Sequence, residues 1–347
     1  MLTRNLNLAF ILSVVIATGA VAAESPRDHI SMAGATTIFP FATAVGERFS
    51  QATQLKPPQI QAIGSGAGFK LFCAGTGVGT PDIAVAVRPM KPEERELCEK
   101  NGVKDIVEIQ FGLVATVIAQ SSAGAKFNNL NRKELFLAMA KEVPDPKDGA
   151  KMVPNPYKTW SDINPALPNT KVMLWVPAEM HGIHDIVLKQ IMLVGCKEVA
   201  AMQPLMANDP KALETACQRP REDGAYVEFK EFSAAVKELQ TNPNTLGVMS
   251  QTHFKPNSGL FSIPLDSYEP STLSVSHGVY PVVEPLLLYV KKANLDVVAG
   301  LKEYLTEFTS EEAIGTNRGY LGPMGVVTLP LNGRNEARAR VAGLGAK

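Results

Sequence analysis

Three short segments of small and polar residues lie where an apolar, strand-like run gives way to a helical pattern: residues 35–39, 64–68 and 181–184. Backbone N–H groups at the start of a helix have no partner within the helix, and the positive end of the helix dipole lies beside them. In an open α/β sheet such turns lie at the carboxyl ends of the strands, where ligands bind. Together with an arginine they indicate an anion site, although each segment alone also fits ordinary helix capping.

Two histidines, His181 and His184, stand at the third segment, and their spacing leaves three roles open. Protonated imidazoles would donate hydrogen bonds to an anion, most strongly below about pH 6.5. Neutral imidazoles three residues apart would instead suit a metal ion, with Glu179 or Asp185 nearby. In the third interpretation His181 caps the helix and His184 packs.

Motifs of catalysis are missing from the chain. The run Gly64-x-Gly66-x-Gly68 is not the dinucleotide fingerprint G-x-G-x-x-G, and no Walker motif follows it. Neither G-x-S-x-G nor H-E-x-x-H occurs. We therefore expect a binding protein that is not an enzyme and needs no cofactor.

Charge and composition exclude other classes. The 347 residues include 34 Lys plus Arg and 34 Asp plus Glu, and 45% are apolar. The balanced charge argues against a nucleic-acid binder, which needs a basic face, and the apolar content is enough for a core of about two domains. Residues 1–23 are typical of a secretory signal peptide, because Arg4 precedes a mainly apolar run over 8–17 and small residues follow. Cleavage is predicted near Ala22 or Ala23, and an uncleaved N-terminal anchor is the alternative.

The four cysteines fall into two pairs that are local in sequence, 73 with 98 and 196 with 217. Export to an oxidising compartment favours disulfides Cys73–Cys98 and Cys196–Cys217, although four cysteines allow three pairings. Zinc binding is less well supported, because neither pair has the short C-x-x-C spacing of a metal site.

Apolar periodicity predicts alternating strands and helices, which is typical of a mainly parallel sheet with helices on both faces. Strands are expected at 30–33, 60–63, 82–87, 106–119, 172–176 and 279–290. Helices are expected at 40–51, 92–101, 131–141, 184–195, 228–241 and 294–309, with one more that follows residues 64–68 and runs through 73, and a frayed surface helix at 334–340. The long strands 106–119 and 279–290 bracket a proline-rich middle block, so the chain is expected to cross twice between two lobes joined by a hinge. Lobe one is predicted to comprise 24–110 and 285–347, and lobe two 111–284.

Several segments resemble the periplasmic phosphate-binding proteins of ABC transporters, in a branch that contains cysteines. Residues 34–41 (Gly-Ala-Thr-Thr-Ile-Phe-Pro-Phe) look like the first ligand loop, 64–73 the second, and 81–88 the third. Residues 221–228, 289–293 and 304–311 also look like segments of that branch, and the similarity runs from about 30 to 330. The resemblance implies a type II solute-binding fold, a monomer in the periplasm, phosphate or a related oxyanion as ligand, and a membrane permease as partner.

The family's ligand residues carry over only in part. The resemblance implies contacts with the ligand from two lobe-one loops, the end of the third strand and a fourth loop in lobe two. These residues are Thr36, Thr37, Ile38, Phe39, Ser65, Arg88, His181, Gly182 and His184.

The fourth loop departs from the family, because His181-Gly182-Ile183-His184-Asp185 stands where the branch has Ser-Gly-Thr-Arg-Asp. Val85 and Val87 also replace polar residues, and Glu284 stands where an arginine is usual. Each lost hydrogen bond to a charged ligand costs about 1.5–3 kcal/mol, so we expect altered anion binding. The alternatives are a phosphonate, a metal ion held by the two histidines, or an interaction or sensor protein without tight phosphate binding.

Overall fold

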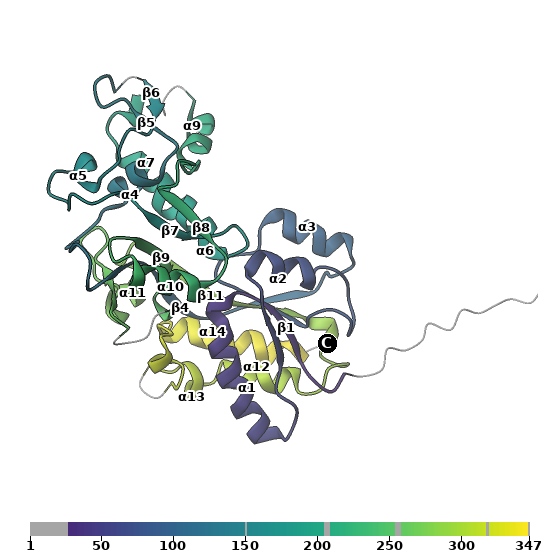
Figure 1. The fold of residues 1–347 in the computed structure, drawn as a ribbon. Helices are drawn as coiled ribbons and strands as arrows, with labels where there is room; N and C mark the ends of the chain where they lie inside the picture. Colours follow the sequence, from purple (N-terminus) through teal and green to yellow (C-terminus); the bar gives the residue numbers. More distant parts are fainter. Residues whose placement is uncertain (1–26, 150, 205–208, 254–257, 317–318, 346–347) are drawn as a thin grey trace, which may run out of the picture.

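Two long strands, β4 (Ile106–Ser121) and β11 (Val283–Lys291), organise the fold of this computed structural model. The structure describes residues 27–149, 151–204, 209–253, 258–316 and 319–345, so the predicted signal peptide lies outside the described residues. The first half of β4 pairs with β11, and its second half pairs with strands of the middle block. A single strand therefore runs through both halves of the molecule (Figure 1).

We call the half that contains both chain ends of the described structure lobe one. Its strands lie in the order β2-β1-β3-β11-β4, in which β2, β1 and β3 are parallel and β11 is antiparallel to β3. The first three strands are β1 (Ser31–Gly34), β2 (Gln59–Ala62) and β3 (Ile83–Ala86). The helices are α1 (Phe39–Thr53), α2 (Ser65–Phe72), α3 (Pro92–Lys100), α12 (Leu301–Phe308), α13 (Glu311–Ile314) and α14 (Leu331–Ala342), with single turns η1 (Thr36–Ile38), η4 (Lys292–Asn294), η5 (Gly322–Met324) and η6 (Gly343–Gly345). In Figure 1, α2 and α3 lie on one side of this sheet and α1, α12 and α14 on the other.

Lobe two is the middle block. Parallel strands β8-β7-β9 continue the sheet from β4, and β10 pairs with the end of β4. Its strands are β5 (Glu142–Pro144), β6 (Met152–Pro154), β7 (Leu174–Pro177), β8 (Tyr226–Phe229), β9 (Leu246–Ser250) and β10 (Leu260–Ile263). Its helices are α4 (Arg132–Met139), α5 (Trp160–Ile163), α6 (Gly182–Ile186), the π-helical η2 (Val187–Met192), α7 (Leu193–Glu198), α9 (Pro210–Cys217), α10 (Phe232–Thr241), η3 (Gln251–His253) and α11 (Thr272–Ser276).

The predicted α/β architecture is confirmed, and both predicted disulfides are present: Cys73–Cys98 and Cys196–Cys217. Between β4 and β11 the register shifts at Leu286/Leu287, so that Phe111 is an extra residue on β4. A bulge of this kind bends a strand. It lies where the chain passes from one lobe to the other, and the residue boundaries proposed for the lobes remain a prediction.

Three predicted helices differ from the structure. The helix expected over 228–241 begins only at Phe232, because the preceding residues pair with β7 as strand β8. The helix expected over 294–309 is confined to α12, since Gly300 adopts a left-handed conformation just before it. The tail helix α14 is not frayed, because Arg334 is buried and bonds to Glu311 and to the carbonyl of Leu329. Tertiary contacts therefore override the local pattern at these positions.

Candidate functional site

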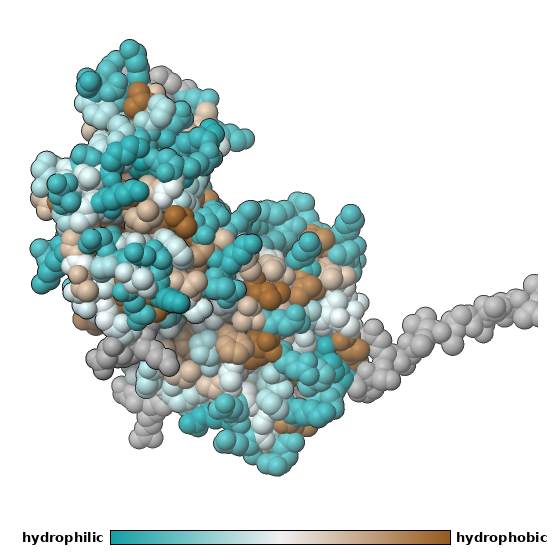
Figure 2. All heavy atoms as spheres, in the orientation of Figure 1, coloured by the Kyte–Doolittle hydropathy of each residue, from teal (hydrophilic) through white to brown (hydrophobic). Residues whose placement is uncertain are grey.

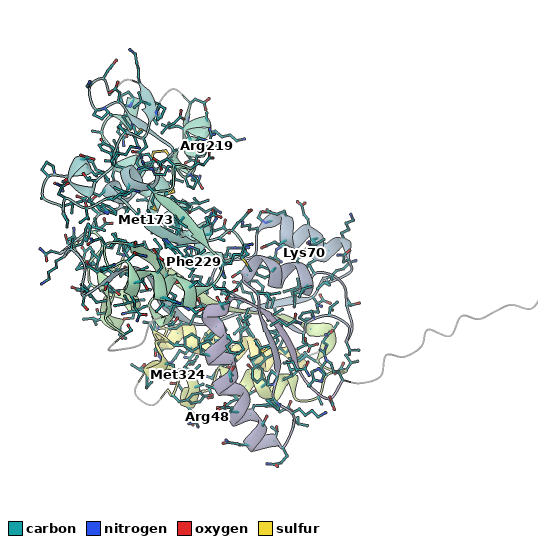
Figure 3. The ribbon with its side chains drawn as sticks, in the orientation of Figure 1. Arg48, Lys70, Met173, Arg219, Phe229 and Met324 are labelled. Carbon is teal, nitrogen blue, oxygen red and sulfur yellow. A yellow bond between two sulfur atoms is a disulfide. The ribbon has the colours of Figure 1, made fainter. Side chains whose placement is uncertain are left out.

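The carboxyl ends of the parallel strands of both lobes meet at one junction. β1, β2 and β3 end at residues 34, 62 and 86, and β7, β8 and β9 end at 177, 229 and 250. Two residues of lobe two that Figure 3 labels show this direction. Phe229, at the end of β8, lies near lobe one, whereas Met173, just before β7, lies farther from it. The loops that follow these strand ends carry nearly all of the predicted site residues.

The first loop places Thr37 at the junction. Thr37 is 2% exposed, and its Oγ1 forms a 3.2 Å hydrogen bond with Nε2 of His253, which follows β9 in lobe two. Ile38 is buried in the main core, whereas Phe39 is 42% exposed. Thr36 begins the turn η1, directly before Thr37.

The second loop (residues 64–68) directly contacts the fourth loop (residues 181–184). Gly64 has φ = 90°, a conformation that L side chains rarely adopt. A Cβ on Gly64 would lie 2.2 Å from the carbonyl oxygen of Met180, so lobe-one backbone touches lobe-two backbone here. The next residue, Ser65, is 1% exposed and starts α2, and its Oγ accepts a 3.4 Å hydrogen bond from the N–H of Val87.

Gly182, the first residue of α6, lies against Ser65 from the other lobe. A Cβ on Gly182 would come within 2.7 Å of Ser65 Oγ and 2.8 Å of Val87 Cγ2. The two lobes are therefore in contact at the predicted ligand loops. The two loops can approach this closely because Gly182 has no side chain.

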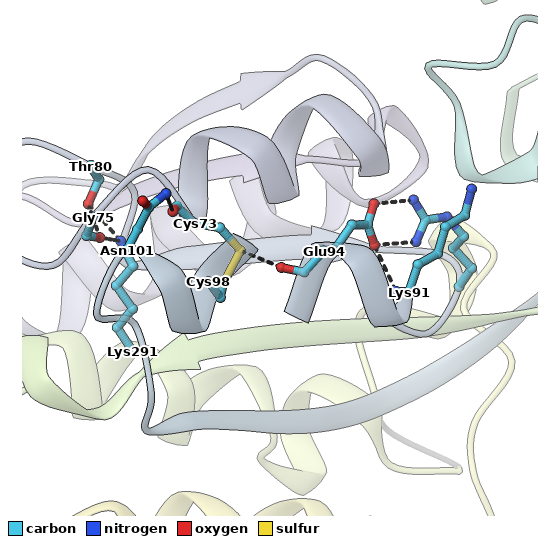
Figure 4. Close-up of a disulfide and its surroundings, with 9 residues drawn as sticks. Cys73, Gly75, Thr80, Lys91, Glu94, Cys98, Asn101 and Lys291 are labelled. Atoms are coloured by element: carbon cyan, nitrogen blue, oxygen red, sulfur yellow. Dashed lines mark hydrogen bonds and ion pairs between the residues drawn. A yellow bond between two sulfur atoms is a disulfide. The ribbon is translucent and has the colours of Figure 1, made fainter. Parts of the chain in front are cut away.

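Arg88 ends the third loop, and its guanidinium group already pairs with two carboxylates. Nη1 and Nη2 donate to the two carboxylate oxygens of Glu94 at 2.8 and 2.6 Å, and Nε lies 2.9 Å from Oδ2 of Asp185 in α6. Lys91 Nζ lies 2.8 Å from the same Asp185 oxygen. Burial lowers the pKa of Arg88, but the hydrogen bond with Glu94 and the charges of both carboxylates raise it, so the net shift is upward. Figure 4 shows Glu94 and Lys91 on the segment that leads to Cys98.

His181 is held as a neutral residue. Its Nε2 donates to the carbonyl oxygen of Lys230 at 2.8 Å, and its ring lies edge-on to Phe232, 5.0 Å between centroids. Burial lowers the pKa of His181 below its usual range, and this outweighs the raising effects of the Lys230 carbonyl and of Glu231. Donation to a ligand oxygen by a protonated His181 is therefore not supported. No side-chain cap of α6 by His181 is formed either.

His184 pairs with Glu228, with Nε2 3.3 Å from Oε1. The two histidines thus have separate partners, one a backbone carbonyl and the other a carboxylate. Among the residues that the structure describes, no group of three or more His, Cys, Asp or Glu side chains is arranged to hold a metal ion. The metal alternative accordingly has no geometric support.

One further residue at the junction, His253, was not singled out from the sequence. His253 stacks on Phe232 with 3.5 Å between ring centroids and an interplanar angle of 8°. Burial, with a smaller effect of His181, lowers the pKa of His253 to about 3. No sequence pattern joins His253 to Thr37, which is 216 positions away, so only the fold brings them together.

Glu284, which stands where the family has an arginine, lies on β11 between the lobes and is fully buried. Its Oε1 accepts a 2.7 Å hydrogen bond from Thr116 Oγ1 on β4. Burial raises the pKa of Glu284 to about 8, although the hydroxyls of Thr116 and Ser250 lower it. The carboxyl is therefore predominantly protonated at pH 7 and adds no full negative charge to the junction.

A groove of about 890 Å³ lies between the lobes, lined by residues 251–252, 260–262 and 269–272 of lobe two and by 322–327 of lobe one. None of the predicted ligand residues lines it. In Figure 2, polar residues cover most of the visible outer surface, and apolar residues gather near α2 and the start of α1, where the lobes meet. Within the described ranges, no helix is long and apolar enough to cross a membrane.

The structure thus brings Thr37, Ser65, Arg88, Gly182 and His181 to the junction of the lobes. Ile38 belongs to the core, Phe39 points outward, and His184 is turned toward Glu228. The role of all of these residues in ligand binding stays a prediction. Glu94, the partner of Arg88 within lobe one, could have been predicted from the sequence, because Glu94 follows Lys91 at the spacing of a helix capping box.

Comparison with known proteins gives one family. Residues 20–312 match the family model described as PBP superfamily domain. Among curated proteins, SphX of Synechococcus elongatus is 25% identical over 284 residues, which cover 79% of this chain and 72% of SphX. The phosphate-binding protein PstS of Staphylococcus haemolyticus is 24% identical over 280 residues, which cover 80% of this chain and 75% of that protein.

Solved structures give the same fold. A putative phosphate ABC transporter substrate-binding protein from Clostridium perfringens, with bound phosphate, has a TM-score of 0.63 at 17% identity and covers 87% of this chain and all of its own. A phosphate-binding protein from Stenotrophomonas maltophilia has a TM-score of 0.65 at 12% identity, covering 90% of this chain and 93% of its own. The two-lobed α/β fold is therefore confirmed.

Proposed function

Because the chain belongs to the PBP superfamily, we propose that it is a solute-binding protein that captures phosphate or a related oxyanion between its two lobes. The observation that carries this proposal is the contact of Ser65 with Gly182 across the junction. These residues start helices in opposite lobes, so their N–H groups would be available to one small anion once the lobes move apart enough to admit it. The names of the relatives, which include phosphate-binding proteins, support the same ligand class.

The proposed partner is the membrane permease of an ABC importer. An exported monomer would close its lobes on the anion and then dock on the permease, since hinge closure around a ligand is a common transition of two-lobed binding proteins. The names of structural neighbours refer to ABC phosphate transport, which supports this partner. We propose no catalytic step, because recognition by hydrogen bonds is sufficient for capture.

A second candidate is an interaction or sensor protein that does not bind phosphate tightly. It is favoured by one observation: every guanidinium nitrogen of Arg88 already lies within 3 Å of a carboxylate oxygen of Glu94 or Asp185. An oxyanion that approaches this arginine must compete with these two carboxylates for its positive charge. Under this candidate the closed junction is a permanent structural contact.

Isothermal titration of the mature chain with inorganic phosphate tests the proposal, with sulfate, methylphosphonate and Zn²⁺ as comparison ligands. We expect saturable binding of phosphate or methylphosphonate and none of Zn²⁺. Arg88→Ala should weaken anion binding by tenfold or more, because a charge-assisted hydrogen bond contributes about 1.5–3 kcal/mol. The matched control is Arg48→Ala, since Arg48 lies on α1 over the ring of Tyr320, 4.0 Å from its centroid, and is absent from the junction.

Two results would refute anion capture. Absence of binding to every anion would favour the second candidate, and equal affinities in the Arg88→Ala and wild-type chains would place the site elsewhere. A separate incubation with a phosphate ester checks the non-enzymatic assignment, and we expect no turnover.

A further inference from the structure

Asp185 is a lobe-two carboxylate that is bonded only to lobe-one cations in the described contacts. It lies on α6, and its Oδ2 is 2.9 Å from Arg88 Nε and 2.8 Å from Lys91 Nζ. Both cations belong to the segment between β3 and α3. The side chain of Asp185 is only 18% exposed, so water screens these ion pairs less than it screens pairs on the open surface.

The other carboxylate on Arg88 is fixed within lobe one. Glu94 accepts from both terminal nitrogens of Arg88 and also from the backbone N–H of Lys91 at 2.8 Å. Opening of the lobes leaves these three bonds intact, whereas it separates Asp185 from Arg88. Asp185 is therefore the carboxylate that can leave when the lobes move.

When Asp185 leaves, the cluster of charges around Arg88 changes from neutral to positive, which favours the binding of an anion. With the lobes in contact, Arg88 and Lys91 are balanced by Glu94 and Asp185, and the cluster is neutral. Without Asp185, lobe one keeps two positive charges and one negative charge. The Nε edge of Arg88 and the ammonium of Lys91 then offer donors to an oxyanion that enters from the junction.

We propose that Asp185 is an internal anion: its carboxylate holds the empty lobes together through Arg88 and Lys91, and an oxyanion binds by taking its place. This inference rests on the proposed function for the ligand, but the bond between the lobes does not depend on it. Asp185 thereby sets both the affinity and the charge class of the ligand. A neutral solute could not displace a carboxylate from a guanidinium.

The test compares the mature wild-type chain with Asp185→Asn, which keeps the shape of the side chain and removes its charge. Titration with inorganic phosphate should show binding that is about tenfold tighter in Asp185→Asn, because the competing anion is gone. Small-angle scattering without ligand should show an upward shift in the radius of gyration. The matched control is Glu214→Gln, which removes a lobe-two charge that pairs with Lys197 at 3.0 Å, away from the junction. It should change neither quantity.

Each outcome decides the proposal. Where phosphate binds, an unchanged or weaker affinity in Asp185→Asn overturns it. Where neither chain binds phosphate, the proposed function fails, and the radius of gyration alone decides: a larger value in Asp185→Asn supports the internal anion and an equal value overturns it. Circular dichroism checks that the variant folds. The wild-type chain gives a measurement that needs no variant, because raising NaCl from about 0.05 to about 0.5 M screens the ion pairs and should also enlarge the radius of gyration.

Discussion

The hydroxyl of Ser65 lies directly opposite the α-carbon of Gly182, so that a β-carbon on Gly182 would approach Ser65 Oγ to 2.7 Å. Val87 Cγ2 closes the same space from the side, at 2.8 Å from that position. Neither neighbour can retreat freely, because Ser65 is buried at the start of α2 and Val87 is 1% exposed in the core. Glycine at 182 is therefore a condition for contact between the lobes.

Gly182→Ala tests this relationship. The added methyl group should keep the lobes apart, because a contact under 3 Å forces its neighbours to move. We expect a larger radius of gyration and phosphate binding weaker by about tenfold. The control is Gly79→Ala, since nothing lies within 4 Å of a Cβ built there. Equal scattering curves for Gly182→Ala and wild type would contradict the prediction.

Glu284 should make stability fall as pH rises from about 4.5 to about 8. Its pKa in the folded chain is about 8 against an ordinary 4.5, so the folded state holds a proton that the unfolded state releases. Its stabilising contribution is complete below about pH 4.5 and is lost as pH rises through about 8, at up to about 1.4 kcal/mol per pH unit. Urea unfolding at pH 6.5 and 8 measures the decline.

Glu284→Gln should remove this part of the pH dependence, because the amide oxygen can still accept from Thr116 and does not titrate. The window of pH 6.5 to 8 separates Glu284 from His253, whose contribution changes only between about 3 and 6.5. Glu303→Gln on the exposed side of α12 is the control and should keep the wild-type slope. A variant slope at residue 284 equal to that of wild type would show that the carboxyl is not buried as described.

His181 should not strengthen anion binding on acidification. Burial lowers its pKa below the ordinary 6.5, so acidification from pH 7.5 charges this imidazole less readily than an exposed one. The stability contributed by neutral His181 is present above about pH 6.5 and is lost as pH falls through its lower folded pKa. Titration calorimetry at pH 7.5 and 5.5 should give the same ratio of phosphate affinities for wild type and His181→Gln. A ratio that differs between wild type and His181→Gln would show that a charged His181 takes part in anion binding.

The strand and helix alternation of lobe one could be predicted because it depends on local apolar periodicity, and the disulfides because each cysteine pair is local in sequence. In lobe two, β8, β9 and β10 were not predicted. The turns that carry Thr37 and Ser65 were also predictable, since short polar segments after apolar strands are visible there, whereas their role in ligand binding stays a prediction. The partners of the loop residues were not. The neutral state of His181 depends on the carbonyl of Lys230 and on the ring of Phe232, and the occupation of Arg88 depends on Asp185 across the junction. Such contacts arise from pairing of distant strands, which periodicity does not specify.

The two disulfides should contribute similarly to stability and differently to binding. Their loops span 25 and 21 residues, so removal of either by double substitution to alanine should lower the free energy of unfolding by about 3 kcal/mol. Cys73–Cys98 joins the end of α2 to α3, the helix that carries Glu94 (Figure 4). Cys196–Cys217 joins α7 to α9 in lobe two.

Only the first pair connects the helix that starts at Ser65 with the carboxylate that holds Arg88. Cys73→Ala/Cys98→Ala should therefore weaken phosphate binding at a temperature where the variant is still folded, whereas Cys196→Ala/Cys217→Ala should leave the affinity within about twofold of wild type. Urea unfolding gives the stabilities, and calorimetric titration of both variants and wild type gives the affinities. Equal losses of affinity in the two variants would mean that binding follows global stability, and that the link from α2 through α3 to Arg88 does not position the site.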